Sequence, residues 1–127
     1  MKRHPALIEL SREHHGALSL ARRIALAEVG TTEWNALRTR VLGPFRSELM
    51  AHFADEETRL LPLLGDTQPA AVERLLDEHR ALKRLLDALK SGEVDAMKKF
   101  GTLLSAHVRF EERQFFVLVQ EQLPTAS

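Results

Sequence analysis

Apolar residues recur every three or four positions along four long segments of the chain, and glycine, proline and small polar residues separate these segments. This spacing places the apolar side chains on one face of an α-helix. No segment shows the sustained alternation of apolar and polar residues that is typical of a strand. The pattern therefore predicts four amphipathic helices, over about residues 5–30, 33–64, 69–91 and 94–123.

Three short loops join the predicted helices, so we expect an all-α fold in which they form an up-down-up-down four-helix bundle. A chain of 127 residues corresponds to a single domain, residues 1–127. Gly43-Pro44 falls inside the second helix and is expected to bend it. The predicted inward faces of the second and fourth helices comprise Leu37, Val41, Phe45, Leu49, His52, Glu56 and Leu63, and Phe100, Leu103, Leu104, Phe110 and Leu118.

A polar motif interrupts two of these apolar faces. The sequence Ala-His-x-x-x-Glu-Glu occurs at residues 51–57 and again at 106–112, each time followed by a cluster of large apolar residues. Residues four apart lie on one face of a helix, so His52 pairs with Glu56 and His107 with Glu111. A buried carboxylate is costly unless it is paired, and a metal ion is a common partner.

Two further histidines fall on the inward faces of the other helices. His14 lies four and seven residues from apolar residues on both sides (Leu7, Leu10, Leu18 and Ala21), and His79 has similar apolar neighbours. His15 is rotated by about 100° and is expected at the edge, while His4 is expected to remain solvated. At about 1.5 Å per residue, all six inward groups fall roughly 12 to 24 Å from the same end of the bundle.

Alternatives exist for each polar residue taken singly, since a lone buried histidine is commonly a hydrogen-bonded core residue. Inward phase and common depth are separate constraints, however, and His14, His52, Glu56, His79, His107 and Glu111 meet both. We therefore predict that these six residues bind metal, with His15 as a candidate additional ligand. Glu57 and Glu112 point about 100° away from the ligand face and are expected to form ion pairs or to contact the ligands.

Composition narrows the chemistry further. The chain has no cysteine, which excludes thiol catalysis, disulfides and cysteine-ligated metals. Any metal must be held by histidine and glutamate, ligands that suit iron, manganese or zinc. The 18 basic and 18 acidic residues cancel, so nucleic acid and membrane surfaces are not expected as partners. No signal peptide or spanning segment is visible, and a cytoplasmic location is expected.

These motifs resemble a hemerythrin-like (HHE cation-binding) domain. The resemblance rests on Glu13-His14, His52-x-x-x-Glu56 with Leu60-Leu61-Pro62, Glu78-His79 and His107-x-x-x-Glu111. It implies a non-haem di-iron site with two Fe ions, oxo- or hydroxo-bridged, or a site that holds Mn or Zn. In this arrangement Glu56 and Glu111 would bridge the metals and the four histidines would be terminal ligands. Ferritin-like proteins use Glu-x-x-His, with the opposite order and a different spacing.

The chain departs from the pattern of oxygen-carrying hemerythrins. These have five histidines, including a His-x-x-x-His pair on the third helix, but Leu75 and Lys83 occupy the positions four residues from His79. Reversible oxygen carriage is therefore not expected, and His15 is the only nearby candidate for a fifth histidine.

Three functions are compatible with this site. The first is a metal-binding protein that binds, senses or handles O2, peroxide or NO, or supplies iron, with a small diatomic ligand or peroxide as its partner. The second is an iron-dependent, peroxidase-like enzyme. The third is a bundle whose metal is structural and whose role is to bind another protein. The sequence alone does not decide whether the protein is an enzyme.

Overall fold

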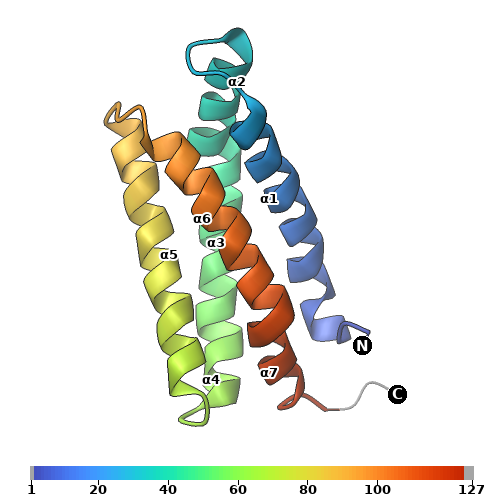
Figure 1. Ribbon diagram of the computed structural model, residues 1–127. Coiled ribbons are helices and arrows are strands. Elements are labelled where there is room, and N and C mark those ends of the chain that lie inside the picture. The colour runs from blue at the N-terminus through green and yellow to red at the C-terminus, as the bar shows by residue number, and fades with distance from the viewer. Residues whose placement is uncertain (1, 125–127) are drawn as a thin grey trace.

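Four helical rods pack side by side in the computed structural model, which describes residues 2–124 (Figure 1). The first rod comprises a 3₁₀ turn, η1 (Pro5–Leu7), and helix α1 (Ile8–Leu26). The third is the single helix α5 (Pro69–Lys90). Within the described residues every regular element is helical, which confirms the predicted all-α bundle.

The second and fourth rods are each built from several helical pieces. The second rod comprises α2 (Thr32–Arg40), η2 (Val41–Phe45), α3 (Arg46–Asp55), η3 (Glu56–Leu60) and α4 (Leu61–Leu64). The fourth comprises α6 (Ala96–Phe110), η4 (Glu111–Phe115) and α7 (Phe116–Gln120). The segments η3 and η4 are single π-helical turns, which contain more residues than an α-helical turn, whereas η2 is a kink between two helices. At η2, Gly43 has non-helical dihedral angles (φ −108°, ψ −105°), which confirms the bend expected at Gly43-Pro44.

The π turns change which residues face the core. Because η3 adds a residue to the turn that follows Glu56, the next inward positions are Leu60 and Leu64. Leu64 is 1% exposed, whereas Leu63, predicted to be inward, is 37% exposed. The prediction for Leu63 was therefore wrong.

The same shift occurs in the fourth rod. There η4 follows Glu111, and Val119 is fully buried while Leu118, which was also predicted to be inward, is only half-buried. One cause, an extra residue in the turn after the inward glutamate, explains both errors.

Tertiary contacts shape the first rod. Helix α1 ends at Leu26, four residues before Gly30. The Lys98 ammonium group donates hydrogen bonds to the carbonyl oxygens of Ile24 (2.6 Å), Ala25 (3.0 Å) and Ala27 (2.7 Å), which have no partner within the helix. A lysine from another rod thus closes the end of α1.

The sequence predicted that His4 is solvated, but in the structure both of its ring nitrogens have a partner. Its Nδ1 accepts a hydrogen bond from the backbone N–H of Ala6 at 3.0 Å and caps η1. Its Nε2 lies 2.8 Å from the carbonyl oxygen of Pro124, so this side chain also links the two ends of the described chain.

The apolar core is divided into two parts along the bundle. One cluster includes Leu20, Trp34, Phe45, Leu82 and Phe100, and the other includes Leu7, Leu64, Leu75, Phe115 and Val119. Along each rod, the inward histidines and glutamates fall where one cluster gives way to the other. The polar residues therefore form a buried layer inside the bundle.

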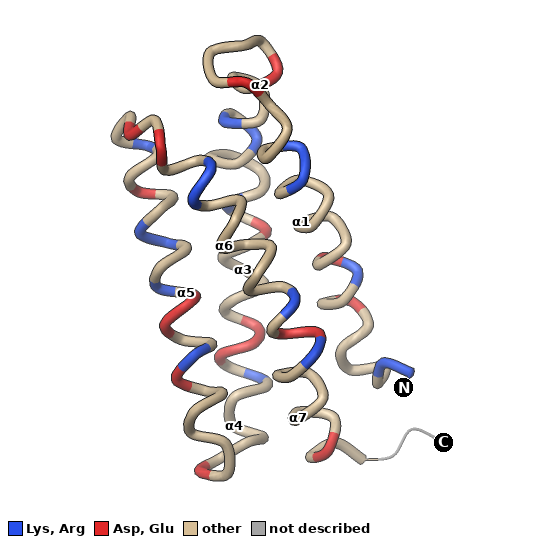
Figure 2. Tube along the Cα trace, in the orientation of Figure 1, with Lys and Arg blue, Asp and Glu red and all other residues tan. Residues whose placement is uncertain are grey.

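The outer surface shows no single field of one charge. Basic and acidic residues are interspersed along the rods (Figure 2), in keeping with the net charge of zero. None of the described helices is long and apolar enough to cross a membrane.

Candidate metal centre

The six inward polar residues meet in one buried layer. They come from α1 (His14), α3 and η3 (His52, Glu56), α5 (His79), and α6 and η4 (His107, Glu111). None is more than 5% exposed, and both glutamates are fully buried. His15 lies on the exposed face of α1 and belongs to neither group of candidate ligands described below.

Among the described residues, these side chains form two overlapping groups that could each hold a metal ion. One consists of His14, His52, Glu56 and Glu111, and the other of Glu56, His79, His107 and Glu111. Within a group, one candidate ligand atom from each residue lies within 4.8 Å of the others. Both glutamates are shared, so the arrangement suits a binuclear metal site with two bridging carboxylates.

Glu56 links the two groups through its two oxygens. Its Oε2 lies 3.2 Å from His52 Nε2, and its Oε1 lies 3.1 Å from His79 Nε2. Glu111 uses one oxygen: Oε1 is 2.8 Å from His107 Nε2 and 3.3 Å from His14 Nε2. Each carboxylate therefore contacts histidines of both groups.

Six buried polar atoms of this layer lack hydrogen-bond partners. Although the atoms lie close together, none of the following has a hydrogen-bond partner: the two oxygens of Glu56, the two oxygens of Glu111, His79 Nε2 and His107 Nε2. His14 Nε2 and His52 Nε2 face each other at 3.1 Å. A buried polar atom without a partner typically costs about 1–3 kcal/mol, and native proteins contain few of them. Two cations bound between these atoms would satisfy the whole set, so the residues present fit a metal pair.

The other ring nitrogen of each histidine contacts a carboxylate. Nδ1 of His14 lies 2.5 Å from Glu112, and Nδ1 of His52 lies 3.1 Å from Glu13. Two further contacts of 2.7 Å join Nδ1 of His79 to Glu57 and Nδ1 of His107 to Glu78. An ionised carboxylate can only accept, so each Nδ1–H donates. In the neutral imidazole this leaves the Nε2 lone pair free for a metal.

These four contacts follow one rule in both halves of the chain, where the first half contains the first two rods and the second half contains the last two. The glutamate that precedes the first histidine bonds to the second histidine of the same half: Glu13 to His52, and Glu78 to His107. The glutamate that follows the inward glutamate bonds to the first histidine of the other half: Glu57 to His79, and Glu112 to His14.

Sequence reasoning identified only part of this outer set. Glu57 and Glu112 were expected to pair or to contact the ligands, and both contact histidines. The roles of Glu13 and Glu78 were missed, although the repeated Glu-His dipeptide was the available signal. Two of the four carboxylates are held in turn: Arg3 and Ser11 donate to Glu112, and Arg74 donates to Glu78.

Electrostatics keep the buried glutamate Glu56 ionised. Burial raises the pKa of Glu56, but hydrogen bonds and positive charge from the His52 and His79 imidazoles, which these rings supply in their protonated form when no metal is bound, outweigh burial and lower it to about 2. Burial lowers the pKa of His52, yet Glu56 and Glu13 outweigh it and raise this pKa above its ordinary value. Burial, with a contribution from His79, lowers the pKa of His107.

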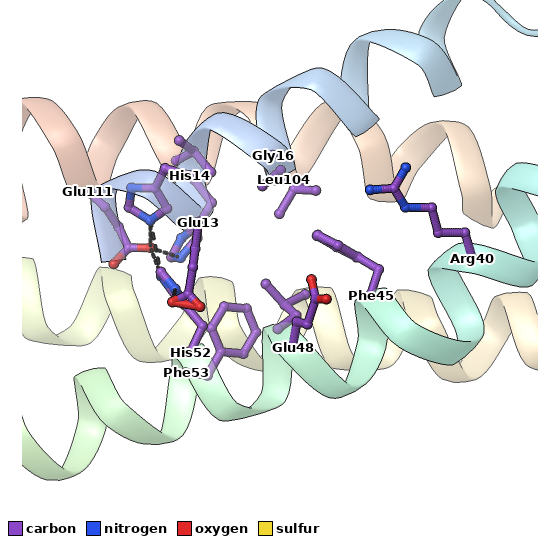
Figure 3. A pocket seen from close by; sticks show the side chains of 14 residues that line it. Glu13, His14, Gly16, Arg40, Phe45, Glu48, His52, Phe53, Leu104 and Glu111 are labelled. Atoms are coloured by element: carbon purple, nitrogen blue, oxygen red, sulfur yellow. Dashed lines mark hydrogen bonds and ion pairs between the residues drawn. The ribbon is translucent and has the colours of Figure 1, made fainter. Parts of the chain in front are cut away.

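Aromatic rings wall the layer unevenly. Phe53 stacks on the His79 ring, with centroids 3.8 Å apart, and presents its edge to His107. A pocket of about 120 Å³, which Phe53 also lines, opens beside the layer; His14, His52, His107 and Glu111 line it but His79 and Glu56 do not (Figure 3). The group that contains His14 and His52 is therefore the more accessible one.

Fold and side chains together define a helical bundle with two overlapping buried groups of histidine and glutamate that suit a binuclear cation site. Residues 6–119 match the family model described as the Hemerythrin HHE cation binding domain, and the chain belongs to this family. No match to the chain was found among curated proteins or among solved structures.

Proposed function

We propose that this protein holds a non-haem di-iron centre that binds and handles small oxygen and nitrogen species, namely O2, peroxide or nitric oxide. The observation that carries the proposal is the pair of overlapping ligand groups that share two buried glutamates whose oxygens lack other partners. Membership of the cation-binding family supports the metal, and the mixed nitrogen and oxygen donors suit iron.

In this proposal each side chain has a defined role. Glu56 and Glu111 would be shared by the two ions, His14 and His52 would help to hold one ion, and His79 and His107 would help to hold the other. The four outer carboxylates hold the imidazoles in the orientation that aims Nε2 inward. When bound, the metals would supply electrons and open coordination positions for an external ligand.

The side chains around the layer support small-ligand chemistry in place of a purely structural metal. Phe53 stacks on the His79 ring, while the pocket reaches His14, His52 and His107. The apolar walls would limit water at the site. The four histidines are one fewer than oxygen carriers have, which favours reaction with peroxide or nitric oxide over reversible oxygen binding.

A peroxidase-like enzyme is the second candidate, and one observation favours it. The pocket of about 120 Å³ beside the ligand groups provides more room than a diatomic molecule requires. Turnover with peroxide and an electron donor would distinguish an enzyme from a protein that binds or senses its ligand.

The direct test is metal analysis and absorption spectroscopy of the protein purified in air. We expect about two irons per chain, with charge-transfer bands that azide or nitric oxide changes, because octahedral iron with four protein donors keeps about two positions open. Zinc in both positions, or an iron spectrum that no added ligand alters, would contradict the proposal.

A further inference from the structure

The pocket beside the metal centre extends well beyond the ligand residues. In Figure 3, the histidines and Glu111 lie at one end and Arg40 lies at the other, with Phe45 and Leu104 between them. Its volume is about 120 Å³. A water molecule occupies about 30 Å³ of the liquid, and an apolar cavity of about 150 Å³ can hold benzene. The pocket therefore has room for a small organic molecule.

The walls of the pocket are mostly apolar. Ala17, Phe45, Leu49, Phe53, Leu104 and Val108 line it between its two ends. Two exposed side chains of opposite charge, Arg40 and Glu48, also line it, and Glu13 is already bonded to His52. Because Arg40 and Glu48 carry no net charge together, this lining suits an uncharged ligand better than an ion.

Gly16 provides a second, independent observation. It lies in the interior of α1, where glycine destabilises a helix relative to alanine. Its φ is not positive, and a Cβ atom built on it would have no neighbour within 4 Å. Gly101 differs, because a Cβ there would lie 3.1 Å from Ile24 Cγ2. Neither backbone geometry nor close packing requires glycine at position 16, yet Gly16 is exposed and lines the pocket.

We propose that the pocket binds a neutral organic hydroperoxide of about four to six non-hydrogen atoms, and that Gly16 keeps its entrance open. The inference rests on the proposed function, because it places the peroxide group at the end of the pocket formed by His14 and His52. The alkyl group then lies among Phe45, Leu49 and Leu104. A side chain at position 16 would project into the entrance without disturbing the core.

The experiment uses zinc-loaded protein, since zinc is redox-inactive and leaves the peroxide intact. Tert-butyl hydroperoxide is titrated while the methyl signals of Leu49, Leu104 and Val108 are followed by NMR. We expect saturable shifts in these signals and intermolecular nuclear Overhauser effects from the tert-butyl methyls to Leu104. Gly16→Leu should weaken binding at least about tenfold, the loss of roughly 1.4 kcal/mol, whereas Gly16→Ala should bind nearly as the wild type does.

Ser19→Leu is the matched control, because Ser19 is also exposed on α1 but lines a different groove. It should leave binding unchanged. The inference is overturned if the pocket methyls show no saturable shift and no contact with the probe, or if Gly16→Leu binds like the wild type. The wild-type measurements stand even if a variant folds poorly.

Failure of this inference and failure of the proposed function give different results. If the pocket excludes organic peroxides, iron-loaded wild-type protein still reacts with hydrogen peroxide or nitric oxide, but zinc-loaded protein does not bind the probe. If the di-iron function is wrong, iron-loaded protein reacts with neither small molecule, whatever the pocket binds.

Discussion

Each buried imidazole of this protein has both ring nitrogens assigned by its surroundings. A carboxylate accepts the Nδ1 proton on the outer side, and Nε2 points into the layer shared by Glu56 and Glu111. The orientation of the candidate ligands therefore depends on residues that would not touch a metal. Two predictions at the scale of single residues follow from this separation.

Glu78→Gln should weaken metal binding without abolishing it. The amide cannot hold the His107 Nδ1–H as an ionised carboxylate does, and loss of such outer partners typically costs roughly tenfold to hundredfold in metal affinity. Competition of the zinc-loaded protein with a chromophoric chelator measures this. Glu73→Gln, at an exposed position of the same helix, is the control. Equal affinities for the two variants would show that Glu78 does not position His107.

His14→Ala and His15→Ala should differ sharply in metal content. His14 is 4% exposed and belongs to one of the ligand groups, whereas His15 is exposed and belongs to neither. We expect His14→Ala to lose at least one metal ion per chain and His15→Ala to retain both, as measured by elemental analysis. The opposite outcome would identify His15 as the ligand.

At the scale of elements, the π turns η3 and η4 decide which side chains pack below the polar layer. Each begins at an inward glutamate, and each moves the following apolar stripe by one residue. Leu64→Ala should therefore destabilise the protein by about 2–5 kcal/mol, the usual cost of removing a buried leucine side chain. Leu63→Ala, its exposed neighbour, should cost less than about 1 kcal/mol.

Chemical denaturation of the two leucine variants gives both values. Comparable losses of unfolding free energy would mean that the helix continues through Glu56 without the extra residue. A larger loss for Leu63→Ala would mean that Leu63 faces the core, as an unbroken α-helix predicts.

The rods and the membership of the polar layer could be predicted because they depend on helical spacing over many turns. His52 and Glu56, four residues apart, meet on one face whatever happens further along the chain. Which residues face the core beyond Glu56 could not be predicted, since nothing in the local sequence of Glu56–Leu60 distinguishes a π turn from an α-helical turn. The end of α1 at Leu26 was missed because the residue that caps it, Lys98, comes from another rod.

At the scale of the whole molecule, removal of metal should lower thermal stability. Without cations, Glu56 and Glu111 remain buried side by side with unsatisfied oxygens. A ligand at 100 times its dissociation constant stabilises the native state by about 2.7 kcal/mol, which for a chain of this size corresponds to about 10 °C in Tm. Thermal melts with and without a chelator measure the difference, and coincident melts would mean that the metal does not contribute to folding.

The stability of the chelated protein should fall on acidification. Contacts with histidines keep the pKa values of Glu56, Glu78 and Glu112 below the ordinary value of 4.5, despite burial. The unfolded chain therefore takes up protons first, and this stabilisation is present above pH 4.5 and lost below it, toward about pH 2 for Glu56.

The histidines act in opposite directions. The lowered pKa of His107 gives stability that is present above pH 6.5 and lost as the pH falls, while the raised pKa of His52 gives stability that is lost as the pH rises. We expect Tm in chelator to fall most steeply below pH 4.5, measured by circular dichroism across buffers. A Tm that rises between pH 4.5 and pH 3 would contradict these signs.

The exchange of carboxylates between the halves of the chain has a consequence for how such a molecule could be divided. Glu57 orients His79 and Glu112 orients His14, so a hairpin containing only the first two rods lacks the group that orients its own first histidine. Two identical hairpins related by a twofold axis would supply these two contacts to each other, and each would keep the contact of Glu13 with His52, or of Glu78 with His107, within itself. The pattern of contacts in this chain is that of a symmetric dimer of hairpins joined into one polypeptide.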